Sequence, residues 1–286
     1  MLWIAFAITS CILLLAVGFA IDKMGFMFWR RNTELLVNRL DRYNSPLAIT
    51  RFNQEELQHL PPPVKTYLQL ALTPGQPIIL ASHCRHSGDF NLGKSGERWK
   101  TFQSDQWFKT HPPGFIWNGC ISILPGVCAR VHDAYIGGEG YLHATIFGLK
   151  SVTNMHGRGD LARSELMRYL AECAWNPTAL LPSQGVVWTP IDENSALATL
   201  SCHGESISLI WGFDRLGHVS TVDAMERPRT VNHRMEYTPW RGRFWNYVKR
   251  DGMVIPLDGD VAWIFPDGAQ PYWRGHIDKI DYTFAD

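Results

Sequence analysis

The sequence predicts a mainly β protein, in which a helical N-terminal part with one transmembrane helix precedes a curved antiparallel sheet, a half-barrel with one covering helix. Three observations predict this fold. An uncharged apolar segment runs from Leu2 to Ile21. One clear helical pattern, Leu161 to Ala174, interrupts the later part of the chain. Around it lie short runs rich in β-branched and aromatic residues, separated by Gly, Pro, Asn and Asp. These runs are residues 101–108, 114–123, 140–149, 196–202, 206–214, 218–227 and 261–266.

The composition is that of a folded chain with no charge bias. Of its 286 residues, 45% are apolar and 19% are charged, so the chain can bury a substantial core. Lys and Arg together number 27, as do Asp and Glu, and this balance provides no basic face for nucleic acid. We therefore expect no nucleic-acid partner. The 12 tryptophans fit a large core, an apolar ligand pocket or a membrane interface.

The apolar segment is the predicted membrane anchor, residues 1–22. The 20 residues from Leu2 to Ile21 would rise about 30 Å as a helix, the thickness of a bilayer's hydrocarbon core. A cleaved signal peptide would instead have a basic start and a shorter apolar run. Basic residues follow the segment and none precedes it, so the positive-inside rule predicts that the body lies on the cytoplasmic side. They include Lys23, Arg30, Arg31, Arg39 and Arg42.

Residues 23–75 form a predicted juxtamembrane helical segment. Its first part, Thr33 to Arg42, reads as an amphipathic helix that either lies on the membrane or packs on the body. The apolar side of this helix comprises Leu35, Leu36 and Leu40. Two further short helices are expected, one starting at Asn53 with the spacing of a capping box and one over residues 64–72.

Residues 76–286 form the predicted β-rich domain. In several strands only alternate positions are apolar, which predicts that one face of the sheet contacts water. A long twisted antiparallel sheet tends to curl, and its concave face must then be filled by aromatic side chains, a helix or a lipid-like ligand. The five cysteines of this domain are an odd number without a CxxC pair. Most are therefore expected to be free buried thiols, as in a reducing compartment.

The most distinctive stretch is RYLAECAWNPTALLP, residues 168–182. Arg168 and Glu172 stand four residues apart on one side of the predicted helix, so their charges can meet. If this side faces the sheet, the pair is buried, and Glu172 could act as a general acid or base. The alternative is a structural ion pair that orients the helix. Pro177 ends the helix and turns the chain toward the next strand.

A ligand of the concave face would meet aromatic and arginine side chains. Arginine beside aromatic rings can pair with an anionic head group, and the rings can contact an apolar tail. The alternative for the arginines is a solvated position at a strand edge. The candidate ligand-binding residues are Trp117, Tyr135, Tyr169, Trp175, Arg227, Arg229, Trp273 and Arg274.

Patterns for metal or cofactor chemistry are weak. His83 and His86 flank a cysteine, but no second ligand pair at zinc-like spacing follows. Gly137 and Gly138 lie between aromatic-rich runs without a phosphate-loop pattern, and are expected in a hairpin turn. No GxSxG nucleophile elbow is present in the sequence. We therefore expect neither a metal nor a cofactor.

Several stretches are together similar to a family of uncharacterised bacterial proteins, DUF6544, formerly DUF6920. They are LPPPVKTYLQLAL (60–72), HPPGFIWNG (111–119), DAYIGGEGYL (133–142), ELMRYLAECAWNPTALLP (165–182), MERPR (225–229), GMVIP (252–256) and PYWRG (271–275). The resemblance spans about residues 57–280, and the helix stretch is its most specific part. It implies one compact domain and brings no established activity. A further likeness to the half-barrel of lipoprotein-sorting carriers concerns the fold alone.

On these observations we expect a membrane-anchored, non-enzymatic domain that binds a lipid or another apolar ligand in its curved sheet. One alternative is a hydrolase or isomerase acting on an apolar substrate, with Glu172 as acid or base and Arg168 holding an anion. The other is a scaffold subunit of a membrane complex, with protein partners and an outer apolar patch.

Overall fold

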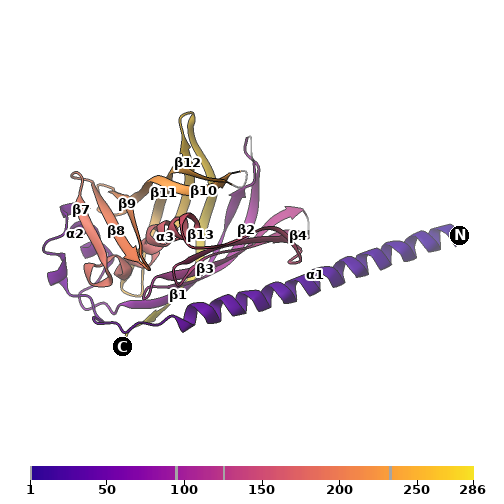
Figure 1. The fold of residues 1–286 in the computed structure, drawn as a ribbon, viewed down its shortest axis with the longest axis horizontal. Helices are drawn as coiled ribbons and strands as arrows, with labels where there is room; N and C mark the ends of the chain where they lie inside the picture. Colours follow the sequence, from indigo (N-terminus) through magenta and orange to yellow (C-terminus); the bar gives the residue numbers. More distant parts are fainter. Residues whose placement is uncertain (1, 94–95, 125, 232–233) are drawn as a thin grey trace.

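A single antiparallel sheet organises the protein (Figure 1). The computed structural model describes residues 2–93, 96–124, 126–231 and 234–286, and only some of the side chains between residues 2 and 17. Among these residues the sheet has 13 strands in the order β6-β5-β4-β3-β2-β1-β13-β12-β11-β10-β9-β8-β7. It consists of two meanders that are joined where β1 pairs with β13. The prediction of a mainly β chain with one antiparallel sheet is confirmed.

Each meander runs strand by strand along the chain. The first comprises β1 (Ile79–Asn91), β2 (Trp99–Lys109), β3 (Gly114–Leu124), β4 (Val127–Ile136), β5 (Glu139–Ile146) and β6 (Lys150–Gly157). The second comprises β7 (Val186–Pro190), β8 (Ser195–Cys202), β9 (Glu205–Phe213), β10 (Val219–Val231), β11 (Arg234–Arg250), β12 (Met253–Phe265) and β13 (Gly268–Phe284). Gly137 and Gly138 form the β4–β5 turn with φ of 61° and 84°, as a tight hairpin requires. The MERPR stretch, residues 225–229, lies inside β10 at a bulge between Ala224 and Arg227.

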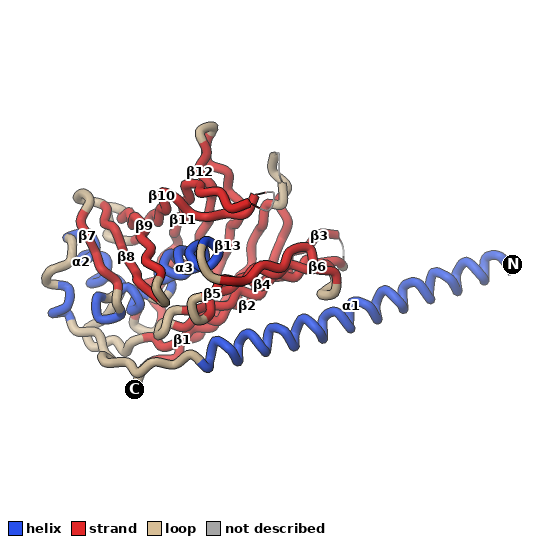
Figure 2. The backbone as a smooth tube through the Cα atoms, viewed as in Figure 1, coloured by secondary structure: helices blue, strands red, loops and turns tan. Residues whose placement is uncertain are grey.

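The two edge strands, β6 and β7, are consecutive in the chain, and the segment between them crosses the concave side of the sheet. It contains α3 (Asp160–Glu172) and the short turns η2 (Cys173–Trp175), η3 (Pro177–Leu180) and η4 (Pro182–Gln184). Helix α3 contacts β3 to β6 of the first meander and β9 and β10 of the second. Figure 2 shows the sheet curving around this helix. The covering helix is therefore the link between the two edges, and the short turns after it redirect the chain into β7.

The N-terminal part contains one long helix, α1 (Leu2–Arg42), where the sequence predicted two separate helices. Its C-terminal end packs on the convex face of the sheet, where Leu36, Val37 and Leu40 contact a small cluster around Ile116. The segment Thr33–Arg42 thus packs on the body, and Leu35, expected on its apolar side, is 59% exposed. The helix expected at Asn53 is a single turn, η1 (Gln54–Leu57), and the next is α2 (Pro62–Ala71).

The N-terminal half of α1 extends away from the sheet (Figure 1). Within the part of the chain that the structure describes, no helix combines the length and the apolar character needed to cross a bilayer. The predicted anchor, residues 1–22, is described only in part: its backbone is helical from Leu2 onward, but Met1 and most side chains between residues 2 and 17 are not described.

Three of the five cysteines of the β-rich domain are free, as expected for most of them, but the other two form a disulfide. Cys120 on β3 and Cys128 on β4 form a disulfide with a Cα–Cα distance of 5.6 Å. The free thiols of the described chain are Cys84, Cys173 and Cys202, of which the first two are buried. Counting cysteines could not show this pair, because the two residues become neighbours only in the paired strands.

Candidate functional site

A cavity of about 440 Å³ lies between the concave face of the sheet and the C-terminal end of α3. This volume is in the usual range of small-molecule sites. Apolar side chains from both meanders line most of it, among them Leu92, Ile121, Leu142, Ile146 and Val261. Charged side chains lie at other points of the wall, so the cavity is amphipathic.

Four tryptophans form part of the cavity wall, and three of them occur in the pattern Trp-X-Gly. They are Trp117 on β3, Trp240 on β11 and Trp273 on β13, joined by Trp175 from η2. Each of the first three rings lies against the glycine two residues further along its own strand. A Cβ on Gly119 or Gly275 would stand only 2.2 Å from the ring of Trp117 or Trp273. The glycines therefore let these rings lie along the sheet and leave the space in front of them open.

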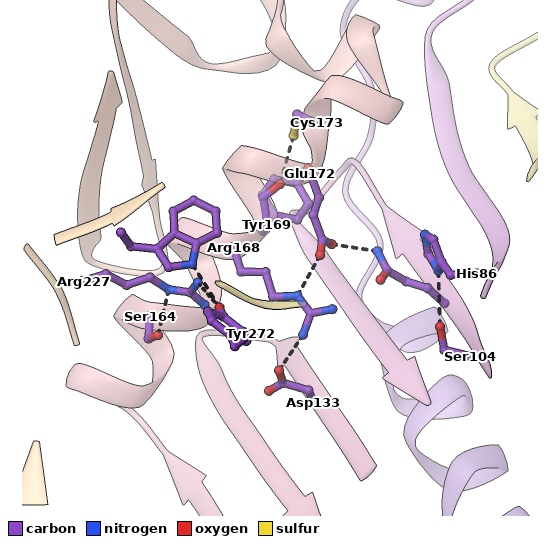
Figure 3. Close-up of polar contacts among 12 residues, drawn as sticks. His86, Ser104, Asp133, Ser164, Arg168, Tyr169, Glu172, Cys173, Arg227 and Tyr272 are labelled. Carbon is purple, nitrogen blue, oxygen red and sulfur yellow. Dashed lines mark hydrogen bonds and ion pairs between the residues drawn. The ribbon is translucent and has the colours of Figure 1, made fainter. Parts of the chain in front are cut away.

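Arg168 lies at the centre of a polar network on the cavity wall (Figure 3). Its Nε donates to Glu172 Oε1 at 2.7 Å and its Nη1 to Asp133 Oδ2 at 2.5 Å. The other oxygen of Glu172 accepts a hydrogen bond from Gln106 Nε2 at 2.7 Å. The guanidinium also lies over the ring of Phe115, 4.9 Å from its centroid. The i,i+4 pair that the spacing predicted thus forms, and β4 supplies a second carboxylate.

The electrostatics of the network follow from its burial. Burial disfavours the charge on Arg168, but Glu172, Asp133 and Glu165 outweigh it and raise the pKa of the guanidinium above its usual value. Glu165, one turn earlier on α3, is only 5% exposed. Burial, and then the neighbouring Asp133, raise the pKa of Glu165 well above its ordinary value.

Arg227 presents a second cation to the cavity, and its surroundings differ from those of Arg168. It comes from the β10 bulge and is 5% exposed. Its Nε donates to Ser164 Oγ at 3.2 Å (Figure 3). Its guanidinium lies 4.9 Å from the ring centroid of Trp240. Among the described residues, no carboxylate oxygen lies within 4.0 Å of this guanidinium. Arg227 is therefore a buried cation that makes no ion pair with a described carboxylate, although its charge acts on Glu165 and opposes the burial-driven rise in the pKa of that carboxyl.

His86 lies behind the aromatic wall. Its ring centroid is 5.3 Å from that of Trp175 and 6.2 Å from that of Trp273. Burial and the charge of Arg168 lower the pKa of His86 to about 3, so the ring is neutral at ordinary pH. Its Nδ1 lies 3.4 Å from the hydroxyl of Ser104. We therefore infer that His86 packs against the wall and holds the rings of Trp175 and Trp273 in place.

The structure brings six of the candidate residues to the cavity and leaves four elsewhere. At the cavity are Trp117, Arg168, Glu172, Trp175, Arg227 and Trp273. Tyr135 and Tyr169 are buried in the core, where Tyr169 stacks on Phe108 at 4.5 Å. Arg229 pairs with Glu236 at 3.4 Å, and Arg274 lies over Trp99. Side chains alternate across a strand, so Trp273 and Arg274 point to opposite faces.

Sequence reasoning missed three charged residues of the wall: Asp133 as a partner of Arg168, and the pair Arg243 and Asp260. Arg243 Nε donates to Asp260 Oδ1 at 2.8 Å across β11 and β12. The repeated Trp-X-Gly pattern was a signal in the sequence that could have marked the cavity strands. For metals, no cluster of three or more His, Cys, Asp or Glu suited to an ion occurs in the described part of the chain.

Residues 58–282 match the model of a family of unknown function, DUF6920. No curated protein sequence matches the chain. A LolA superfamily protein from Nitrosomonas europaea is similar in structure, with 10% identity and a TM-score of 0.35 over 84% of this chain and 96% of its own. A β-barrel-like protein of the domain of unknown function DUF1849 from Brucella abortus has 10% identity and a TM-score of 0.25, over 72% of this chain and 99% of its own.

Proposed function

This chain belongs to the DUF6920 family, and we propose that it is a membrane-anchored domain that binds a lipid or a similar ligand with an anionic head and an apolar tail. The observation that carries this proposal is Arg227, a buried cation on the wall of an apolar cavity without a close carboxylate. A buried charge is destabilising unless it is paired. An anionic head group in the cavity would supply the missing partner.

The aromatic wall supports the same ligand class. The indole Nε1 atoms of Trp117 and Trp175 are buried and have no hydrogen-bond partner among the described residues. These nitrogens are not exposed to the cavity, so the rings of the two tryptophans would contact the ligand through their apolar surface. The apolar side chains of β3 to β6 would contact the tail.

The membrane anchor is part of the proposal. It is supported by the uncharged sequence from Leu2 to Ile21 and by the extension of α1 beyond the sheet (Figure 1). The basic residues that follow the segment favour the cytoplasmic side for the body. If the Cys120–Cys128 disulfide were found intact in freshly isolated membranes, the body would instead lie on the opposite, oxidising side, because disulfides persist in oxidising compartments.

Binding can be tested with cis-parinaric acid, a fluorescent fatty acid, and its uncharged methyl ester. We expect the full chain in mild detergent to bind both, and Arg227→Met to weaken binding of the acid by about tenfold or more while sparing the ester. Arg229→Met is the matched control, since Arg229 pairs with Glu236 away from the cavity. Equal affinities of the acid for both variants, with no lipid co-purifying by native mass spectrometry, would overturn the proposal.

One observation favours a second function, an enzyme acting on an apolar substrate. Burial and the neighbouring Asp133 raise the pKa of Glu165, and Asp133 reaches the cavity wall, so this carboxyl pair offers a site for proton transfer to a bound substrate. Glu172, the acid or base expected from the sequence, has both oxygens engaged by Arg168 and Gln106. If the protein is an enzyme, Asp133→Asn should abolish turnover of a bound ester or lipid. Persistence of turnover in that variant would exclude this carboxyl pair.

A further inference from the structure

Helix α1 touches the β5–β6 turn through its backbone. A Cβ on Gly25 would stand 1.7 Å from the carbonyl oxygen of Phe147, and a Cβ on Gly148 would stand 2.4 Å from that of Gly25. Only glycine permits such an approach, and Gly148 also has a positive φ of 69°. The turn is therefore held against one position of the helix.

Further contacts fix the helix along the convex face. Trp29 Nε1 donates to Asn118 Oδ1 at 2.8 Å, and the Thr33 hydroxyl lies 2.7 Å from His132 Nε2. The Trp29 ring also stacks on that of His132 at 3.8 Å. The N-terminal half of α1 consequently leaves the domain in a defined direction.

The contact at Gly25 lies four residues after Ile21, the end of the uncharged segment. Four helical residues correspond to about 6 Å. If the uncharged segment spans a bilayer, as the proposed function states, the β5–β6 turn lies at the surface of that bilayer. Figures 1 and 2 show the ends of β3, β4 and β6 on the side toward which α1 extends.

The strand ends at this level carry exposed apolar side chains. Leu124 at the end of β3 and Val152 on β6 are 64% and 65% exposed, and Phe147 and Leu149 flank the turn glycine. Val152 also lines the cavity. We define Leu124, Phe147, Leu149 and Val152 as the apolar rim. It is continuous with the inside of the cavity.

The charges beside the apolar rim suit anionic head groups. Lys23 lies just after the uncharged segment, Arg130 lies over the ring of Phe26 at 5.0 Å, and Lys150 begins β6. Asp22 is the acidic residue of the same stretch. Basic side chains near a membrane surface are attracted to anionic lipids, while apolar side chains enter the interface.

We propose that the apolar rim is seated in the surface of the bilayer that holds α1, so that the cavity exchanges its ligand directly with the adjacent leaflet. This inference rests on the proposed anchor and extends it to a second membrane contact. The partner is a lipid surface that contains anionic lipid. The protein would then load and unload without leaving the membrane.

The test uses the full chain reconstituted into vesicles of phosphatidylcholine and phosphatidylglycerol. An environment-sensitive nitrobenzoxadiazole label is placed on Leu124→Cys or, as the matched control, on Leu216→Cys, which replaces a 73% exposed leucine in the β9–β10 turn. The unmodified chain, labelled in parallel, gives the background from its own thiols. We expect a blue shift and strong quenching by nitroxide-labelled lipid at position 124, and neither at position 216.

Each other outcome would overturn the inference in a distinguishable way. A water-exposed label at position 124 in a chain that floats with the vesicles would remove the rim contact and leave the anchor in place. A blue shift without nitroxide quenching would mean that protein, such as a second copy, covers the rim. A chain that fails to float would refute the anchor and the rim together, while binding of cis-parinaric acid tests the cavity independently.

Discussion

The Arg168 network provides the sharpest energetic prediction. Arg168→Met removes the cation and leaves the carboxylates of Asp133 and Glu172 on the cavity wall without it. Breaking a buried ion pair by removing one partner costs about 3–5 kcal/mol, because the other charge remains buried. The side chains of the three residues are 17%, 19% and 12% exposed, so partial contact with water places this variant near the lower limit.

This energy corresponds to a measurable shift in melting temperature. For a domain of this size, 1 kcal/mol lowers the melting temperature by roughly 2–4 °C. A loss of about 3 kcal/mol therefore predicts a decrease of roughly 6–12 °C. Differential scanning calorimetry of the full chain in detergent, together with urea unfolding, measures both quantities.

Two further variants make the prediction refutable. The triple variant Arg168→Met, Asp133→Asn, Glu172→Gln removes the charges along with the cation, and should recover more than half of the lost stability. Arg30→Met breaks an exposed pair with Glu34, whose side chains are 70% and 58% exposed, and should change stability by less than about 0.5 kcal/mol. A loss below about 1 kcal/mol in Arg168→Met, or no recovery in the triple variant, would refute the reasoning.

Three other predictions follow from the structure. Gly275→Ala places a Cβ 2.2 Å from the Trp273 ring, which must then move into the cavity, so this variant should lose about 1–3 kcal/mol of stability and bind cis-parinaric acid more weakly. Gly242→Ala, whose Cβ would stand 3.1 Å from the Trp240 ring, should reduce both stability and binding less, and equal effects of the two variants would contradict the proposed ring positions. Replacing Cys120 and Cys128 by alanine opens a loop with a sequence separation of 8 and should lower the free energy of unfolding by about 2–3 kcal/mol, and non-reducing mass spectrometry checks whether the bond is present at all. Burial and His143 lower the pKa of His132 to about 3, below the ordinary value of 6.5, so the unfolded chain binds more protons and stability should fall as the pH drops from 6.5 toward 3. By pH 4 the titration of His132 should lower the free energy of unfolding by up to about 3 kcal/mol. If the wild type and His132→Gln gave parallel curves of stability against pH, His132 would not be the cause of this loss.

Much of the fold could be predicted because the relevant signals are local. Helix α3 was expected over Leu161–Ala174 and spans Asp160–Glu172, since its apolar and charged residues alternate with helical period. The β4–β5 turn followed from Gly137 and Gly138, which tolerate positive φ. The errors lie where local signals compete with packing. The single helix α1 continues through Thr33–Arg42 because the sheet provides a surface for its C-terminal end.

The candidate site was predictable only in part. Arg168 and Glu172 could be paired from their spacing alone, because residues four apart on a helix are neighbours. Two other features depend on the strand register and on the face of the sheet that each side chain occupies: Asp133 contacts Arg168, and Tyr135 lies in the core. A shift of one residue along a strand exchanges the two faces, and no local pattern specified this register.

The sequence by itself determined the uncharged N-terminal segment, the strand-rich body, the helix between its two halves and the helical ion pair. These features depend on residues within a few positions of one another. Only the tertiary structure decided that β1 pairs with β13, that Cys120 meets Cys128, and that Arg227 faces an apolar cavity without a close carboxylate. Such contacts join residues far apart in the chain, and they form only when the sheet curves around α3 and encloses the space between them.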